Sequence, residues 1–330
     1  GAPRPTPFIP HPQLDVEITS THIASDNVYT VTVSTPAPGC GDSAPYPFFA
    51  LAPGSSYFFD DFNAPDSANI GNNWTEKNPD AFSLVDNSII GIETSLVYRD
   101  NIVYRPTVED RANVEVAVEF VRVNDRGFPQ IHARAQRDTI AVPDLLESYI
   151  FYIEDNRPPT GAATFAVGPD LVSTGECHIA EIPLTNALQL GQRYRLRLRV
   201  LGSNPVELTG TVERFANGIW QTEFVTTVYH DVNTPPDPSY CDPGFMPPQL
   251  TAAGSSGFSK WLDAPDNYDN FYWVDLTSTA PVPGITSILP DQIEQNGPDF
   301  TLLVNGSNFT PTSVVMWNGD PRPTAYVDST

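Results

Sequence analysis

The side chains able to do chemistry in this sequence are carboxylates, histidines and cysteines, and none forms a familiar catalytic pattern. Glycoside hydrolysis needs two carboxylates that face each other across a groove. Glu115 and Glu119 instead alternate with apolar residues, which predicts a solvated strand face. Serine and cysteine nucleophile signatures are missing as well. The histidines are scattered through the chain: His11, His22, His132, His178 and His230. We therefore predict that the chain is not an enzyme.

The cysteines indicate at least one unpaired thiol, because the chain has 3 of them. The pairing we favour is Cys177–Cys241, which would pin the proline-rich stretch 231–249. Cys40 is then either a free thiol or an intermolecular link.

Aromatic side chains supply the other candidate chemistry, a platform on which a sugar ring can stack. Phe271, Tyr272 and Trp273 are consecutive, so on a strand at least one faces away from the other two. Trp220 follows a turn. Packing in a core or an interface is the alternative role for these rings.

The overall charge excludes several kinds of partner. The 330 residues carry a formal net charge of −23, with 17 basic against 40 acidic residues. Nucleic acid and anionic lipid would repel such a chain. No apolar stretch is long enough to span a membrane. We predict an extracellular or cell-surface protein without nucleic-acid partners or membrane insertion.

The elements that position these residues are short strands, because 34 prolines and 21 glycines leave no room for long helices. Apolar and polar residues alternate over Val114–Phe120, Tyr194–Val200, Val206–Phe215 and Gln221–Tyr229. Tyr149–Ile153 predicts a strand buried on both sides. The fold class is therefore all-β, with a large central sandwich or jelly roll over 56–278.

Three motifs make this central part resemble the concanavalin/laminin-G jelly rolls: Phe59–Trp74, His132–Gln136, and Tyr194–Leu198 followed by Gly202. The family includes lectins, carbohydrate-binding modules and glycoside hydrolases, so the fold alone does not decide function. The Glu-x-Asp-x-x-Glu run of the hydrolases is missing.

The resemblance also implies a calcium site, because related jelly rolls often hold a structural ion where their first and last strands meet. Asp60, Asp61 and Asp275 occupy those positions. Calcium prefers several oxygen ligands at once. The alternative is that these carboxylates cap turns. No other cofactor is expected.

The two ends of the chain repeat each other. Residues 1–12 read GAPRPTPFIPHP and residues 319–330 read GDPRPTAYVDST. Residues 283–319 predict a strand over Phe300–Val304, a turn at Asn305-Gly306 and a strand over Val314–Trp317. At the other end, alternation predicts extended segments at Leu14–Ile18 and Tyr29–Val33.

These ends resemble halves of an IPT/TIG domain, an immunoglobulin-like sandwich of bacterial surface proteins. The C-terminal half carries Ile285–Pro290, Gly306–Thr310, Trp317–Gly319 and the Pro-Arg-Pro-Thr run, and Tyr29–Leu51 resembles the closing strands. The resemblance implies three parts: 1–55, 56–278 and 279–330. The two half-domains are either parts of two neighbouring domains divided by chance, or halves that complete each other between copies of the chain.

Half a sandwich leaves an apolar face and strand edges uncovered. The main hypothesis is therefore a non-catalytic structural subunit or repeat, joined head to tail to copies of itself by strand complementation. Its alternative is a carbohydrate-binding adhesin module, and a secreted glycoside hydrolase is a third reading. The predicted interface consists of Gly1, Pro3, Arg4, Phe8, Leu14, Val16, Tyr29, Val31, Val33, Phe300, Leu302, Val304, Trp317, Arg322 and Tyr326.

Overall fold

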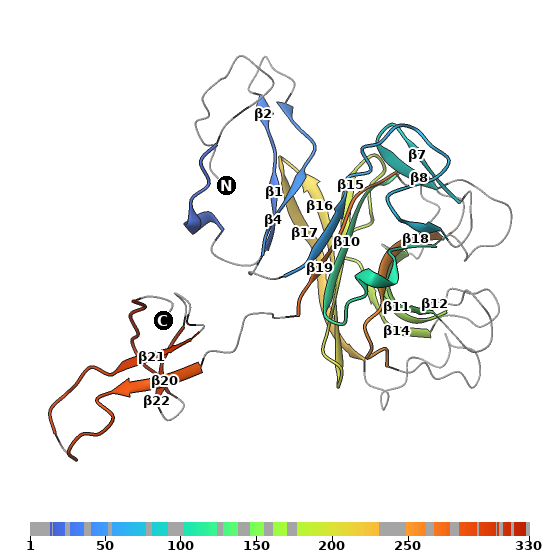
Figure 1. Ribbon diagram of the computed structural model, residues 1–330. Helices are drawn as coiled ribbons and strands as arrows, with labels where there is room; N and C mark the ends of the chain where they lie inside the picture. The colour runs from blue at the N-terminus through green and yellow to red at the C-terminus, as the bar shows by residue number, and fades with distance from the viewer. Residues whose placement is uncertain are drawn as a thin grey trace. The chain divides into compact units, whose positions relative to one another are not determined.

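The fold was analysed in a computed structural model, which describes residues 14, 16–23, 27–35, 41–51, 55–76, 81–91, 102–123, 128–137, 146–154, 161–169, 177–230, 249–261, 267–277, 284–295, 297–307, 309, 313–317 and 320–327. Over these residues the chain is all-β: it forms strands and two short 3₁₀ helices, and no α-helix. The chain divides into two compact units, one of residues 1–51 and 55–277, the other of residues 52–54 and 278–330 (Figure 1).

An eight-stranded antiparallel sheet forms one layer of the larger unit, in the order β17-β16-β15-β10-β19-β8-β7, with β5 pairing β19. Its strands are β5 (Tyr57–Asp60), β7 (Phe82–Val85), β8 (Ser88–Gly91), β10 (Val114–Val121), β15 (Arg193–Leu201), β16 (Val206–Ala216), β17 (Ile219–His230) and β19 (Asn267–Asp275). The expected strands in 114–120, 194–200, 206–215 and 221–229 are therefore confirmed.

A seven-stranded sheet forms the second layer, in the order β14-β13-β12-β11-β18-β9-β6. Its strands are β6 (Thr75–Glu76), β9 (Ile102–Tyr104), β11 (Phe128–Arg137), β12 (Leu146–Glu154), β13 (Ala162–Pro169), β14 (Cys177–Pro183) and β18 (Ser255–Trp261). The short helix η2 (Thr107–Glu109) follows β9. On β12, Phe151 and Ile150 point to opposite faces and are both buried, as the apolar run predicted.

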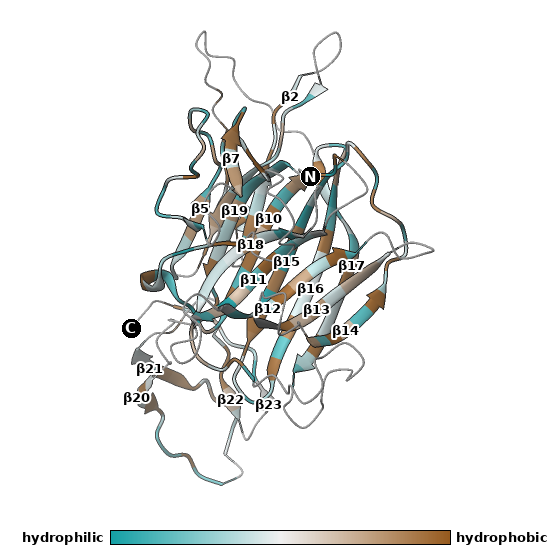
Figure 2. Cartoon of the chain, turned by 90° about the vertical axis from the view of Figure 1, so that its right-hand side faces the viewer, coloured by the Kyte–Doolittle hydropathy of each residue, from teal (hydrophilic) through white to brown (hydrophobic). Residues whose placement is uncertain are grey.

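The core lies between the two sheets, where every second residue of a strand points inward. Val116, Val118 and Phe120 from β10 are fully buried with Phe151 and Phe165 of the facing sheet. Figure 2 shows the resulting alternation of hydrophobic and hydrophilic residues along the strands. Gly210 on β16 leaves room for the facing rings, because a Cβ atom there would lie 2.5 Å from Phe151 and 2.6 Å from Phe165.

The N-terminal segment belongs to the same compact unit as the sandwich. After the short helix η1 (Ser20–His22), β1 (Asn27–Val31) pairs with β4 (Tyr46–Ala50), and β2 (Ser34–Thr35) pairs with β3 (Gly41–Asp42). Residues 16–19 pair with no strand, and residue 14 forms a single β-bridge, so the extended segment expected over Leu14–Ile18 stays a prediction. The division of the chain into three parts stays a prediction.

The smaller unit contains two short antiparallel pairs. β20 (Gly284–Leu289) pairs with β21 (Leu303–Ser307), and β22 (Met316–Trp317) pairs with β23 (Asp320–Pro321). The immunoglobulin-like character predicted for both ends of the chain stays a prediction. No helix among the described residues is long and apolar enough to cross a membrane.

The turn expected at Asn305-Gly306 is wrong, because both residues lie within β21. Ile285 pairs with Gly306 in the register of the two strands. A Cβ atom at Gly306 would lie 2.0 Å from the Gly284 carbonyl oxygen and 2.4 Å from the Phe309 ring. Glycine is therefore required here for close approach and not for a turn, and the strand begins three residues later than predicted.

Candidate functional site

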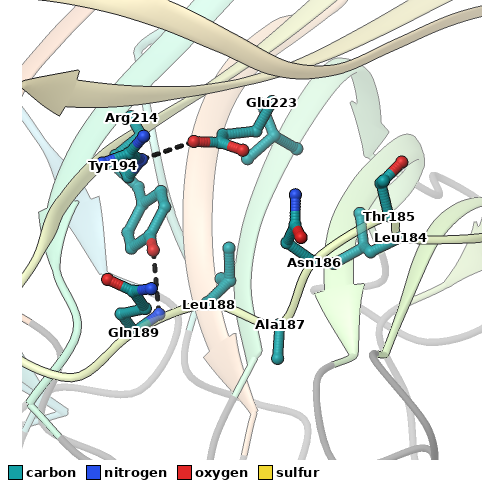
Figure 3. A pocket seen from close by; sticks show the side chains of 10 residues that line it. Leu184, Thr185, Asn186, Ala187, Leu188, Gln189, Tyr194, Arg214 and Glu223 are labelled. Atoms are coloured by element: carbon teal, nitrogen blue, oxygen red, sulfur yellow. Dashed lines mark hydrogen bonds and ion pairs between the residues drawn. The ribbon is translucent and has the colours of Figure 1, made fainter.

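A pocket opens where the connection from β14 to β15 crosses the end of the eight-stranded sheet (Figure 3). Its volume is about 260 Å³. The lining residues are Leu184, Thr185, Asn186, Ala187, Leu188, Gln189, Tyr194, Val212, Arg214 and Glu223.

The connection that forms one wall is tied down at both ends by the backbone. The Leu184 N–H donates to the Gly161 carbonyl at 2.9 Å, and the Gly191 N–H donates to the Arg122 carbonyl at 2.7 Å. Gly191 has a φ of +74°, which the tight turn into β15 requires. Next to it, the Gln189 N–H donates to the Tyr194 hydroxyl oxygen at 2.8 Å. The wall is thus fixed at one end by the residue before β13 and at the other end by the residue after β10.

A β-bulge brings a carboxylate to the opposite wall. Val212 pairs with Phe224 and Glu213 pairs with Thr222, so Glu223 is an extra residue on β17. A bulge changes the direction of a side chain and is common beside functional sites. Glu223 forms an ion pair with Arg214 Nε, and Arg214 Nη2 donates to Gln221 Oε1 at 3.2 Å. The hydrogen bond to Glu223 raises the pKa of Arg214.

The pocket combines hydrogen-bonding groups with an apolar floor. Asn186 and Gln189 offer amides, and Figure 3 shows the Asn186 amide directed toward the side that carries Glu223. Leu188 and Val212 supply apolar contact. Such a mixture can orient a small polar ligand through several directional contacts. Among the lining residues that the structure describes, Glu223 is the only carboxylate, whereas glycoside hydrolysis requires two.

A second cluster of charges lies on the face of the eight-stranded sheet that points away from the core. Arg197 binds both oxygens of Glu115 at 2.9 Å, and Arg195 lies 2.7 Å from Glu213. Glu115 is 8 % exposed and Glu119 is 2 % exposed. The expectation that these two carboxylates form a solvated strand face is therefore wrong.

Glu119 is the most strongly perturbed carboxyl of this charged face. Its Oε2 atom lies 3.0 Å from Arg193 Nη1, and Asp269 lies 2.9 Å from the same nitrogen. Burial raises the pKa of Glu119 to about 7, although Asn270 donates a hydrogen bond to it. A carboxyl so deeply buried cannot touch a substrate, so the network is structural.

The N-terminal hairpin β1–β4 covers part of this charged face. The Phe49 ring lies 5.4 Å from the Tyr272 ring and stacks on Tyr57 at 4.5 Å. Val28 and Phe49 pack against the buried cluster of Ala117, Tyr272 and Val274. The Tyr272 hydroxyl in turn donates to Glu115 at 3.5 Å.

A polar row runs along the face of the seven-stranded sheet that points away from the core. His132 Nε2 lies 2.6 Å from Ser259 Oγ, and its Nδ1 lies 2.9 Å from Ser148 Oγ. Ser259 also donates to Gln130 Oε1 at 2.8 Å. His132 is fully buried, so this hydrogen-bonded row is closed to solvent at His132.

The three carboxylates predicted to bind calcium do not meet. Asp60 accepts hydrogen bonds from Asn72 and Trp74, both at 2.8 Å, while Asp275 pairs with Arg111 at 3.2 Å. The β5–β19 register places Asp60 and Asp275 at opposite ends of the pairing. Asp61 accepts from the Asn63 N–H in a local turn. In the described part of the chain no group of three or more His, Cys, Asp or Glu suits a metal ion. Calcium binding stays a prediction.

The predicted interface residues divide by exposure. Gly1, Pro3, Arg4 and Phe8 lie outside the described residues. Tyr29, Leu302 and Val304 are half-buried, and Arg322 is exposed. The other apolar members are also exposed, namely Leu14, Val16, Val31, Val33, Phe300, Trp317 and Tyr326. The structure contains one copy of the chain, so the interface stays a prediction.

Cys177 is disulfide-bonded. Cys40 and Cys241 both lie outside the described residues, so the Cys177–Cys241 pairing also stays a prediction.

The candidate sugar platform is not open to solvent, because Phe271, Tyr272 and Trp273 are all buried. Trp220 packs under the Arg195 guanidinium at 4.4 Å. Sequence reasoning missed the pocket, although its polar segment Thr185–Gln189 precedes a recognisable strand.

No protein-family model matches the chain, and no curated protein matches it. Similar solved structures include the CBM2 module of the evolved Dit protein of Lactobacillus casei BL23 phage J-1, with 11 % identity, 67 % of this chain and 96 % of that chain covered, and a TM-score of 0.39. A Bacillus subtilis protein with a galectin-like fold has 12 % identity, 66 % and 94 % coverage and a TM-score of 0.38. The GH16 endo-β-1,3(4)-glucanase SCLam has 11 % identity, 66 % and 90 % coverage and a TM-score of 0.37. At these values the likenesses assign neither a family nor an activity to this chain.

Proposed function

We propose that the sandwich is a carbohydrate-binding module of an extracellular protein and that the pocket under the β14–β15 connection holds the sugar. The observation that carries the proposal is the lining itself, in which amides, a hydroxyl and an ion pair surround an apolar floor. Sugar hydroxyls donate and accept hydrogen bonds, and carboxylate and amide groups satisfy both needs. The C–H faces of the ring pack on apolar side chains.

The disulfide at Cys177 supports an extracellular location. Disulfides persist in oxidising environments outside the cytosol. The net charge of −23 fits a protein that must remain soluble there.

The test is glycan binding by the whole chain and by two single variants. Asn186→Ala removes an amide from the pocket and should weaken binding of the best glycan at least tenfold. Asn63→Ala removes an exposed amide in the loop after β5 and should leave the affinity unchanged. Equal affinities for both variants would contradict the location of the site, and no binding to a broad glycan panel would contradict the function.

A second function, assembly with further copies of the chain, is favoured by a different observation. Both hairpin regions expose large apolar side chains: in the smaller unit Ile285 is 69 % exposed and Leu289 is 63 % exposed, and Val31 in β1 is 48 % exposed. The sequence repeat that links 1–12 to 319–330 supports pairing between the two regions in different copies. Edges and faces of this kind are covered by strand addition in other assemblies.

Sedimentation of the purified chain tests this second function. We expect oligomers that grow with concentration, and Leu289→Glu should return the chain to a monomer by placing a charge in the apolar face. Glu294→Gln, an exposed change in the same unit, is the matched control. A chain that stays monomeric at every concentration would contradict the proposal.

A further inference from the structure

We infer that the pocket selects an uncharged sugar ring and discriminates against uronates and sulfated sugars, an inference that rests on the proposed carbohydrate-binding function. Among the described residues, the charges in the lining are one guanidinium, Arg214, and one carboxylate, Glu223, and they bind each other. The described part of the pocket therefore offers an anionic ligand no cation that is not already paired.

Arg214 is occupied on more than one side. Besides Glu223, it donates to the Gln221 side-chain oxygen at 3.2 Å. An anionic sugar would have to displace Glu223 to reach the guanidinium, which would leave that carboxylate without its partner beside a like charge. Recognition of carboxylate or sulfate groups normally uses an arginine whose guanidinium N–H groups are not already bound to another acceptor.

The groups that remain available suit hydroxyls. Asn186 and Gln189 provide amides and Thr185 provides a hydroxyl, while the carboxylate of Glu223 accepts hydrogen bonds from donors. A hydroxyl donates to this carboxylate without competing for Arg214. The ion pair and a neutral ring can therefore coexist in the pocket.

The size of the pocket limits the ligand. The pocket is small, with a volume of about 260 Å³, so we expect one sugar ring to make most of the contacts with its lining. A monosaccharide glycoside is therefore a sufficient probe.

The net negative charge of the whole molecule also disfavours anionic sugars. The excess of 40 acidic over 17 basic residues repels polyanions before contact. Salt screens this long-range effect, with a Debye length of about 10 Å at 0.1 M. A preference for neutral sugars that persists at high salt must therefore come from the pocket itself.

The experiment compares pairs of methyl glycosides that differ only at C6, where a hydroxymethyl group is replaced by a carboxylate. The pairs are glucoside with glucuronide, galactoside with galacturonide and mannoside with mannuronide, and binding is measured at 0.1 M and 0.5 M salt. We expect the neutral member of the binding pair to bind at least tenfold tighter at both salt concentrations. A uronide that binds as tightly as its neutral partner would overturn the inference while leaving the carbohydrate-binding function intact. A chain that binds none of these probes and no glycan on a panel would overturn both.

Glu223→Gln provides the internal check. This change removes the repelling carboxylate and frees Arg214, so the uronide should gain affinity several-fold and the preference should shrink. Glu294→Gln changes the net charge by the same amount in the smaller unit and should leave the preference unchanged. An unchanged preference in a folded Glu223→Gln protein would overturn the inference.

Discussion

Two neighbouring residues of β16, Glu213 and Arg214, form ion pairs on opposite faces of the same sheet. Glu213 binds Arg195 on the covered face, where the two side chains are 10 % and 5 % exposed. Arg214 binds Glu223 in the pocket, where the side chains are 31 % and 24 % exposed. The chemistry of the two pairs is the same, and only their contact with water differs.

This difference separates a structural pair from one that can meet a ligand. A buried ion pair loses its hydration, and removing one partner leaves an uncompensated charge. A partly exposed pair exchanges with water at little cost. We therefore expect changes on the covered face to alter stability and changes in the pocket to alter binding.

The largest expected effect comes from Arg195→Ala on the covered face. It removes the nearer of the two guanidiniums that face the buried Glu213 and leaves Arg197 Nη1 at 3.6 Å. The change should lower the free energy of unfolding by about 3–5 kcal/mol. Urea denaturation measures the loss. The double variant with Arg195→Met and Glu213→Leu removes both charges and should recover most of it. A loss below about 1 kcal/mol in the single variant would mean that water reaches this pair.

The second-largest expected effect is a dependence of the free energy of unfolding on pH, caused by the titration of Glu119. The folded-state pKa of about 7 lies above the ordinary value of 4.5, so the folded protein holds the proton more tightly than the unfolded chain. The stabilisation is complete below pH 4.5 and is lost as the pH rises through 7, by roughly 3 kcal/mol at about 1.4 kcal/mol per pKa unit. Denaturation at pH 5 and pH 8 measures it, and Glu119→Gln should reduce the slope. Stability that rises over this range would contradict the buried position of Glu119.

A smaller loss of stability is expected when the packing of the hairpin β1–β4 on the sheet is weakened. Phe49→Ala removes a half-buried ring from Tyr57 and Tyr272 and should cost about 2 kcal/mol, less than a fully buried phenylalanine. Phe48, the next residue on β4, is 47 % exposed and is the matched control, with an expected cost below about 0.5 kcal/mol. Hydrogen exchange over β1 and β4 should rise in the Phe49 variant alone. Equal effects of the two changes would show that the hairpin does not pack on the sheet.

The smallest effect on stability should come from breaking the Arg214–Glu223 ion pair in the pocket. Glu223→Gln leaves a guanidinium that water can solvate, so the free energy of unfolding should change far less than in Arg195→Ala. Urea denaturation of the two variants side by side checks this order. A loss as large as that of Arg195→Ala would remove the distinction between the two faces.

The sequence predicts the sandwich well, because alternation within one strand reports which side chains point inward. Val116 and Leu198 are core residues for this reason. Alternation within one strand does not predict the burial of Glu115, whose contacts are Arg197 and Tyr272 on the two adjacent strands. The sequence did contain a signal for buried ion pairs, because β15 carries an arginine at every second position and these arginines lie opposite Glu115 and Glu119 of β10.

The pocket depends on details that alternation does not contain. A one-residue bulge at Glu223 turns its carboxylate toward Arg214, and no residue type marks that position. Gly306 shows the related limit, because an Asn-Gly pair predicts a turn from local propensity while close contact with Gly284 selects the same glycine within a strand. In both cases a neighbouring strand decides the outcome.

The central claim, that the pocket binds a sugar, is tested most directly by an NMR titration of the labelled chain with the neutral methyl glycosides. The account predicts saturable shifts of the Asn186 and Gln189 side-chain amides, with no shift of the Asn63 amide. Saturable shifts confined to other parts of the molecule, or no shift with any neutral sugar, would contradict it.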